Sequence, residues 1–296
     1  MTLKKKRKIG LVLGGGGGKG AYQVGVWKAL KEFKIDKRIG YISGTSIGSL
    51  NSLLFLNGDL DNAINVWSNV TKEVALTKRS FKDIFTKRAL FSRQGFIDLA
   101  DKNVDFEKVS KSKIKSFVVA TPDTKVKGAP SSFCLNGKKK EDIIDIVLAS
   151  SAIPFVFEPV YINGIKYRDG YMVDNNPVRL LKEQGCNLIF VVPLKEFSTA
   201  YECADENTTI IDFVSGYNDY GIIDGTLDFV ADRAKMRINH GYHVAKQLIE
   251  ELINEGVIAI TFRQKIRAFF INKKKKRLPR RSYYSLSKEI IKHRPQ

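Results

Sequence analysis

The sequence predicts an α/β fold, in which a β-sheet carries helices on its faces. Strand-length apolar segments occur at residues 8–13 and 38–43, and apolar side chains recur at helical spacing over residues 21–33 between them. A second helical pattern follows Ser46 and stops at the Asn57-Gly58 pair. This β-α-β-α order is typical of a sheet covered by helices.

Later segments extend the pattern. We expect further strands at residues 116–120, 132–135, 161–162, 165–167, 188–193 and 257–262. Further helices are expected at residues 142–151, 177–184 and about 227–254. Asn163 and Gly164 form the turn of a hairpin. Residues 198–220 are polar without a clear period, and we expect a mobile segment near the functional site there.

The composition changes after Phe262, which predicts a division into a catalytic domain of residues 1–262 and a basic tail of residues 263–296. The tail has thirteen Lys and Arg residues and one acidic residue, Glu289, and residues 4–8 are all basic. The total net charge is +19, so the ends are cationic and the body is nearly neutral. Such ends attract an anionic membrane surface or nucleic acid. No RNA- or DNA-binding motif accompanies the charge, so we expect the membrane surface as partner and no nucleic acid. A disordered, solvated tail without a partner is the alternative.

The chain of 296 residues, 43% of them hydrophobic, is long enough for one large domain with a core. No apolar stretch reaches the length that spans a bilayer, and the apolar segment after the basic N-terminus is too short for a signal peptide. We therefore expect a cytoplasmic protein, peripheral on the inner face of the membrane. Cys134, Cys186 and Cys203 are scattered, which favours free thiols over disulfides or a metal site.

A glycine run at residues 14–18, followed by Lys19 and Gly20, lies between the first strand and the first helix. Glycines allow close approach to the backbone, and N–H groups at a helix N-terminus bind anions. A nucleotide P-loop fails because Leu13 and Gly20 stand where that motif needs Gly and Ser or Thr. An oxyanion hole for acyl transfer is one remaining function of the run.

A dinucleotide-binding fingerprint is the other remaining function of the glycine run. Gly15, Gly17 and Gly20 satisfy G-x-G-x-x-G, and Asp36 lies at about the distance of a ribose-binding acid. In a run with this many glycines the match is nearly automatic, so it weighs little. It nevertheless keeps a nucleotide- or nucleic-acid-binding protein as the alternative function.

Residues 44–48 read Gly-Thr-Ser-Ile-Gly, the G-x-S-x-G pattern of a nucleophile elbow, placed after the second strand. Ser46 would be the nucleophile, and Gly44 and Gly48 would allow the sharp strand-to-helix turn. The proton acceptor is less obvious, because the chain has three histidines. His293 lies in the tail, and His240 and His243 fall in a long helical pattern.

A carboxylate is the other available base. Asp169 and Gly170 lie just beyond the predicted hairpin, in a stretch rich in turn-forming residues. An ordinary aspartate is a weak base, but burial in an apolar cleft raises its pKa. The sequence therefore leaves both a histidine and Asp169 open as the partner of Ser46.

Four ordered blocks resemble the patatin-like phospholipase family, in its bacterial branch. Residues 14–20 match its glycine-rich oxyanion block and residues 44–48 its elbow. Residues 150–160 (SSAIPFVFEPV) are similar to its S-x-A-x-P-x-x-F-x-P segment, and Asp169 with Gly170 matches its D-G-[GA] block. Tyr171 departs from that last block, where the family has Gly or Ala, and a bulky side chain there would narrow the active-site cleft or shift the loop.

The resemblance implies a mixed sheet flanked by helices and a serine lipid acyl hydrolase. No metal or cofactor is expected, because no cluster of His, Asp and Glu residues has the spacing of metal ligands. Ser46 would attack a phospholipid or related acyl ester, and Asp169 would be the general base. The N–H groups of Gly15, Gly16 and Gly17 would form the oxyanion hole. Lys19 falls on the basic position of the glycine block, where it would order the loop. A relative that binds lipid without catalysis is the remaining alternative.

Overall fold

The computed structural model describes residues 7–87, 89–124, 129–195, 198–214, 225–274 and 282–286. Its centre is a mixed sheet in which β1 (Ile9–Leu13) lies between β2 (Ile39–Thr45) and β9 (Leu188–Val192), parallel to both. The strand order is β11-β10-β9-β1-β2-β5-β8-β7, and β6 also pairs with β5. The other strands are β5 (Lys115–Pro122), β6 (Ser131–Cys134), β7 (Val160–Ile162), β8 (Ile165–Asp169), β10 (Thr209–Asp212) and β11 (Tyr283–Tyr284).

The strands are parallel from β11 to β5, whereas β6 and β8 run antiparallel to β5. The mixed sheet that the family resemblance implied is therefore present. Because successive side chains of a strand point to opposite faces of the sheet, β1 contributes side chains to two hydrophobic cores. Leu11 and Leu13 belong to the larger core and Val12 to the smaller one.

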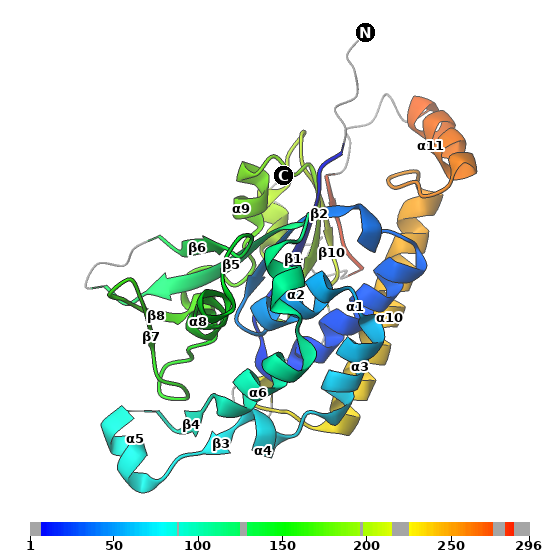
Figure 1. The fold of residues 1–296 in the computed structure, drawn as a ribbon. Coiled ribbons are helices and arrows are strands. Elements are labelled where there is room, and N and C mark those ends of the chain that lie inside the picture. The colour runs from blue at the N-terminus through cyan, green and yellow to red at the C-terminus, as the bar shows by residue number, and fades with distance from the viewer. Residues whose placement is uncertain are drawn as a thin grey trace.

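Helices cover both faces of this sheet (Figure 1). The larger core lies under α1 (Ala21–Glu32), α2 (Ile47–Asn57), α3 (Leu60–Asn69), α8 (Lys140–Ser150) and α10 (Ala231–Asn254), and the smaller core lies under α9 (Val178–Glu183). Short 3-10 helices are η1 (Gly17–Gly20), η2 (Asp36–Arg38), η3 (Gly170–Met172) and η4 (Ala200–Cys203). None of the helices within the described ranges is long and apolar enough to cross a bilayer.

A layer of short elements, which no sequence pattern predicted, lies at one end of the sheet (Figure 1). It contains α4 (Lys72–Ala75), β3 (Thr77–Lys78), α5 (Phe81–Lys87), β4 (Phe91–Ser92) and α6 (Gln94–Asn103). Helix α7 (Phe106–Ser110) follows and packs on α2 and α8. The hairpin of β3 and β4 is antiparallel and separate from the main sheet. This layer supplies a wall of the pocket described below.

Local signals placed several boundaries correctly. Asn163 and Gly164 have φ angles of 51° and 76°, as a two-residue hairpin turn between β7 and β8 requires. Helix α2 ends at Asn57, and Gly58 follows with a φ of 72° in the left-handed region. Helix α10 begins at Ala231 instead of residue 227.

The strand predicted at residues 257–262 is wrong. Gly256, with a φ of 73°, ends α10, and the N–H groups of Val257 and Ile258 donate back to Leu252 O. The carbonyl of Val257 accepts from Arg7 Nη1. The backbone groups that a strand would need are thus used to close the helix, and helix α11 (Phe262–Lys274) follows.

The polar stretch at residues 198–220 also differs from the expectation, since it contains η4 and the parallel strand β10. Strand β11, from the predicted tail, pairs with β10, and the Tyr283 hydroxyl donates to Asp212 Oδ2 over 2.8 Å. Residue 262 is therefore not a boundary of the sheet. The expected mobile segment at residues 215–220, most of the basic N-terminus and the rest of the tail lie outside the described residues.

Candidate active site

Ser46 lies at the sharp turn between β2 and α2. Its φ of 54° and ψ of −125° are strained for a residue with a side chain. The flanking glycines make the turn sterically possible. A Cβ at Gly48 would lie 2.0 Å from Leu13 O, and one at Gly44 would lie 2.6 Å from Gly48 O. The G-x-S-x-G stretch therefore adopts the geometry of a nucleophile elbow.

Asp169 reaches Ser46 through strand pairing. Thr45 pairs with Val119 of β5, and Ala120 of the same strand pairs with Asp169 at the end of β8. The Ser46 hydroxyl donates to Asp169 Oδ2 over 2.7 Å, and both residues are buried. Gly170 permits this approach, because a Cβ there would lie 2.3 Å from Val119 O.

The environment makes Asp169 a stronger base than an ordinary aspartate. Burial raises its pKa to about 7, while the Tyr171 N–H, the Ser46 hydroxyl and the positive charge of Arg93 act in the opposite direction. The Tyr171 N–H donates to Oδ1 over 2.9 Å, which fixes the carboxylate and leaves Oδ2 for Ser46. A carboxyl group with a pKa near neutrality can accept a proton from a hydroxyl and return it later.

Ser150 connects the nucleophile elbow to β5 by hydrogen bonds. The Ser46 N–H donates to Ser150 Oγ over 2.8 Å, and Ser150 Oγ donates to Val119 O over 2.6 Å. The strained residue is thereby tied to β5. Ser150 begins the SSAIPFVFEPV block, so the resemblance marked its position, but nothing in the sequence indicated this contact.

The glycine loop lies against the elbow, since a Cβ at Gly15 would lie 3.0 Å from Ser46 Cβ. Gly15 was expected to donate to an oxyanion, but its N–H donates to Asn175 Oδ1 over 3.1 Å and also contacts Asn175 O at 3.4 Å. Among the described residues, no acceptor faces the N–H groups of Gly16 and Gly17. Gly17 has a φ of 56°. These two amides are the free donors of the expected set.

The outer side of the loop is covered by the protein itself. A Cβ at Gly17 would lie 1.9 Å from Thr226 O, and one at Gly18 would lie 2.0 Å from Asp228 O. This backbone occupies the space that a dinucleotide pyrophosphate would need. Asp36 lies in η2, before β2, at the amino end of that strand rather than near the loop. The dinucleotide alternative therefore has no support in the geometry.

A buried polar network fixes the loop from inside. Gln23 Nε2 donates to Gly14 O over 2.8 Å, and Asn51 links Gln23 to Gly20 O. Lys19, expected to order the loop, is 6% exposed and lies within η1. A loop held this firmly keeps its amides aimed without reorganisation, which is what an oxyanion hole requires.

The histidines lie elsewhere. His240 and His243 are on α10, where their rings contact Tyr22 and Tyr242. His293 lies outside the described residues. Tyr171 does not narrow the cleft, because its side chain is 53% exposed and carries Lys195 Nζ 4.5 Å from its ring centre. Tyr171, the residue that departs from the family's aspartate block, therefore lies on the surface.

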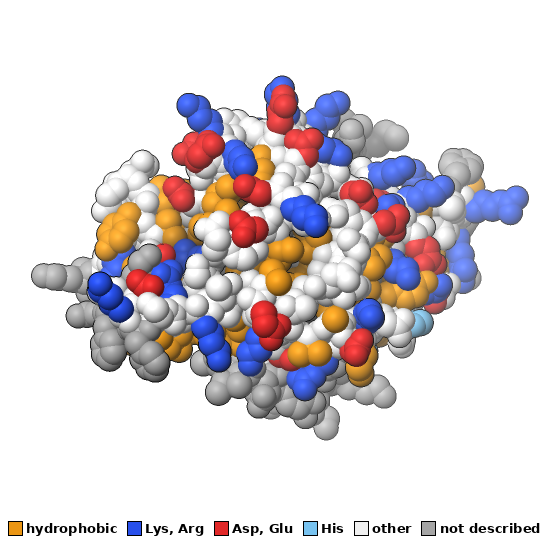
Figure 2. Space-filling model, turned by 60° about the horizontal axis from the view of Figure 1, so that its bottom comes forward, with side chains coloured by type: hydrophobic (Ala, Val, Ile, Leu, Met, Phe, Trp, Pro, Cys, Tyr) orange, Lys and Arg blue, Asp and Glu red, His pale blue; other side chains and the backbone are white. Residues whose placement is uncertain are grey.

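Ser46 opens into an apolar pocket between α2, α6 and residues 226–229. Its lining residues are Gly17, Ser46, Ile47, Leu50, Arg93, Phe96, Ser151, Ile153, Phe157, Thr226, Leu227 and Phe229. A second, almost wholly apolar cavity shares four of these residues and continues between α2, α3 and α6. Figure 2 shows hydrophobic side chains exposed among charged ones on the face of the molecule that carries this layer of short elements.

The sequence also matches a known protein family. A sequence model of the family described as patatin-like phospholipase matches residues 11–182 of the chain. The match covers more than half of the 296 residues and includes both Ser46 and Asp169. The chain therefore belongs to the patatin-like phospholipase family.

Similar proteins include lysophospholipases of fungi. The lysophospholipase NTE1 of Candida glabrata is 31% identical over 202 residues, which are 62% of this chain and 10% of that protein. The lysophospholipase NTE1 of Saccharomyces cerevisiae is 26% identical over 277 residues, 85% of this chain and 14% of that protein. The chain thus spans about a tenth of the length of the curated relatives it matches. The crystal structure of VipD from Legionella pneumophila aligns with a TM-score of 0.48 and 14% identity, covering 91% of this chain and 74% of VipD.

Proposed function

We propose that the protein is a serine lipid acyl hydrolase that cleaves phospholipid or related fatty-acyl esters through an acyl-enzyme intermediate. The observation that carries the proposal is the 2.7 Å hydrogen bond from Ser46 Oγ to Asp169 Oδ2 in a water-poor site. Its setting on a strained elbow beside free loop amides supports acyl transfer. The lysophospholipase relatives support lysophospholipids as one substrate class.

In the first half-reaction, Ser46 Oγ attacks the ester carbonyl carbon while Asp169 Oδ2 takes the hydroxyl proton. The carbonyl oxygen becomes an oxyanion, which the N–H groups of Gly16 and Gly17 stabilise. Collapse of the tetrahedral intermediate breaks the ester C–O bond. Asp169 returns the proton to the leaving alcohol, and the acyl group stays on Ser46.

In the second half-reaction, a water molecule gives its proton to Asp169 and attacks the acyl carbonyl. The same amides hold the second oxyanion. Breaking the bond to Ser46 Oγ releases the fatty acid, and the proton on Asp169 returns to Ser46. One carboxylate therefore serves both halves as base and acid, without a histidine.

The apolar side chains that line the two cavities favour the binding of an acyl chain. Ile47, Leu50, Phe96 and Phe229 line both the pocket at Ser46 and the apolar cavity behind it. An acyl chain bound there would bury its methylene groups against these side chains, at about 0.8 kcal/mol per group.

The test is labelling with a fluorophosphonate together with turnover of a chromogenic acyl ester. The wild type should be labelled at Ser46 and hydrolyse the ester. Ser46→Ala should lose both signals, and Asp169→Asn should lose at least about 10³-fold in kcat with an unchanged circular dichroism spectrum. His243→Ala, on the exposed side of α10, is the control that keeps activity.

Two outcomes would overturn the proposal. A folded wild type that neither reacts with the probe nor turns over esters would be a lipid-binding relative without catalysis. Loss of activity in His240→Ala together with full activity in Asp169→Asn would assign the base to the histidine.

We also propose an anionic membrane surface as a partner, with the protein peripheral on the inner face of the cytoplasmic membrane. Helix α11 is cationic and exposes Ile266 and Phe269, 46% and 61% accessible. This combination is typical of a segment that lies on an anionic lipid surface. The helix lies at the opposite end of the sheet from the layer of short elements (Figure 1), so it would tether the protein without forming the substrate entrance.

A further inference from the structure

Arg93 is a buried cation in the wall of the pocket at Ser46, and nothing in the sequence indicated a role for it. It precedes α6 and is 6% exposed. Its Nε and Nη2 atoms are buried and have no hydrogen-bond acceptor within the part of the chain that the structure describes. Its guanidinium lies over the Phe157 ring at 5.5 Å. Buried unsatisfied guanidinium groups are rare, because each unpaired donor has lost its hydrogen bonds to water without gaining others.

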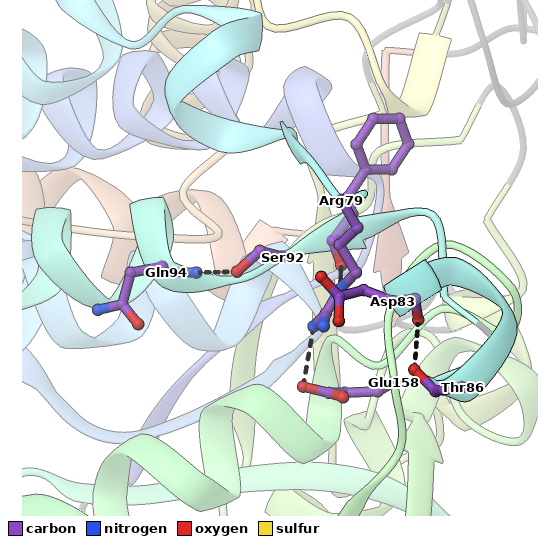
Figure 3. Close-up of polar contacts among 7 residues, drawn as sticks. Arg79, Asp83, Thr86, Ser92, Gln94 and Glu158 are labelled. Carbon is purple, nitrogen blue, oxygen red and sulfur yellow. Dashed lines mark hydrogen bonds and ion pairs between the residues drawn. The ribbon is translucent and has the colours of Figure 1, made fainter. Parts of the chain in front are cut away.

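Glu158, an acidic residue near Arg93, already has another partner. Glu158 Oε1 accepts from Arg79 Nη2 over 3.0 Å, as Figure 3 shows, and the side chain of Arg79 is 8% exposed. Burial lowers the pKa of Arg93 to about 10, which leaves the group charged at neutral pH, and Glu158 and Asp169 oppose that lowering. Arg93 is therefore a permanent positive charge whose donors Nε and Nη2 are unoccupied among the described residues.

The backbone holds Arg93 in this position. The N–H of Leu90 donates to Phe155 O and that of Phe91 to Val156 O, each over 3.0 Å. Arg79 Nε donates to Phe91 O over 3.0 Å, and the Gln94 N–H donates to Ser92 Oγ over 3.2 Å (Figure 3). The segment before Arg93 is thus tied to residues 155 and 156, and the Arg93 carbonyl accepts the Ile97 N–H of α6 over 3.1 Å. The site is therefore built before a ligand arrives.

We propose that Arg93 binds the phosphate of a glycerophospholipid whose acyl ester lies at Ser46. A guanidinium presents parallel N–H donors that match two oxygens of a phosphate. Only the glycerol unit separates the phosphate from an acyl ester in such a lipid, so one pocket can hold both groups. The inference rests on the proposed hydrolase function and makes the enzyme selective for phosphate-bearing substrates over neutral acyl glycerols.

The turnover experiment compares lysophosphatidylcholine with monoacylglycerol of the same chain length, both as monomers. Arg93→Gln should lower kcat/KM for lysophosphatidylcholine about 10- to 100-fold, mainly through KM, and change the value for monoacylglycerol less than about threefold. Arg93→Lys should keep part of the preference for lysophosphatidylcholine, because the positive charge remains while the parallel N–H donors of the guanidinium are lost. Arg168→Gln removes a guanidinium that is already paired with Asp123, and it should leave the ratio unchanged.

An equal loss on both substrates, with the acid limb of the pH profile moved to higher pH, would overturn the proposal. Arg93 would then act on Asp169 and not on the lipid. An unchanged ratio in Arg93→Gln would overturn it as well. We expect the melting temperature of Arg93→Gln to equal or exceed that of the wild type, because an unsatisfied buried charge is removed. If Arg93→Gln fails to fold, Arg93→Lys serves for both comparisons.

A binding experiment separates this inference from the hydrolase proposal. An ether-linked lysophosphatidylcholine should bind the Ser46→Ala variant at least about tenfold more tightly than the double variant Ser46→Ala, Arg93→Gln. An ether-linked alkylglycerol should bind both variants equally. If inorganic phosphate binds at Arg93 and the ether lipid does not, the site is one for free phosphate, which contradicts a lipid site. Selective lipid binding without turnover in the wild type would sink the hydrolase proposal and leave the phosphate site standing.

Discussion

The Ser46 hydroxyl donates to Asp169 Oδ2 over 2.7 Å, across 123 positions of sequence. The carboxylate also accepts the Tyr171 N–H, and both side chains are nearly excluded from water. Burial raises the pKa of Asp169 to about 7, so the hydroxyl faces a base whose protonation changes within the physiological range. Because a carboxylate and not a histidine faces the serine, the pH dependence of the reaction follows from this single pKa.

The first prediction concerns that pH dependence. Asp169 accepts a proton only when ionised, so activity should be present above its pKa and lost as the pH falls through it. We expect kcat/KM for a soluble acyl ester to rise with a midpoint near pH 7 and to fall about tenfold per unit below it. An ordinary aspartate would place the midpoint near about 4. The profile should be measured across neutral pH, with circular dichroism as the control for folding. Full activity about two units below the midpoint would contradict the assignment.

The second prediction concerns Ser150 as a positioning residue. Ser150→Ala leaves the N–H of the strained Ser46 without its acceptor. We expect kcat to fall about 10- to 100-fold with little change in KM, and stability to fall by about 1–3 kcal/mol. Ser116→Ala is the matched control, since the Ser116 hydroxyl is buried without a partner among the described residues. Denaturant titration and steady-state kinetics measure both effects. A normal kcat in Ser150→Ala would show that Ser150 does not position Ser46 for catalysis.

The third prediction concerns the steric basis of the elbow. Gly48→Ala would place a methyl group 2.0 Å from Leu13 O, and that carbonyl belongs to the central strand. We expect a loss of at least about 3 kcal/mol in unfolding free energy, or failure to fold. Gly40→Ala is the control on the strand that leads into the elbow, because an added Cβ there meets nothing within 4 Å. Equal melting temperatures for the two variants would show that the turn tolerates a side chain.

The parts of the site that sequence reasoning found are those with local steric requirements. The turn at Ser46 needs glycines on both sides. The residues made Asp169 one candidate base and the resemblance favoured it over histidine, and β5 brings it to the serine. A strand pairing cannot be read from composition, so the sequence alone left histidine and aspartate open. Gly15 shows the limit of such reasoning. Its N–H is taken by Asn175, 160 residues away, and no local pattern records that contact.

The parts that were missed depend on long-range packing. Arg93 lies between elements of two and ten residues, too short for a periodic signal. Strand β10 has four residues and becomes a strand because β9 and β11 lie beside it. The apolar run at residues 257–262 has the composition of a strand, but the end of α10 uses its N–H groups first. Tertiary hydrogen bonding overrides propensity in both directions.

The fourth prediction concerns α11 as the membrane tether. Deleting residues 263–296 would also remove β11 and its buried Tyr283, so loss of binding in a truncated protein would be ambiguous. The triple variant Arg263→Gln, Lys265→Gln and Arg267→Gln removes three exposed charges and keeps the strand. At about 1 kcal/mol for each charge, binding to anionic vesicles should weaken about 100-fold.

Turnover of a soluble ester by this triple variant should stay unchanged, because α11 lies beside Ile9 and Leu188, at the amino ends of β1 and β9, whereas Ser46 follows the carboxyl end of β2. Sedimentation with vesicles at about 0.1 M salt measures the binding. The control replaces Lys111, Lys113 and Lys139 by Gln, which makes the same change in net charge on other exposed positions. If both triple variants lose binding equally, the attraction belongs to net charge, and α11 is not the tether.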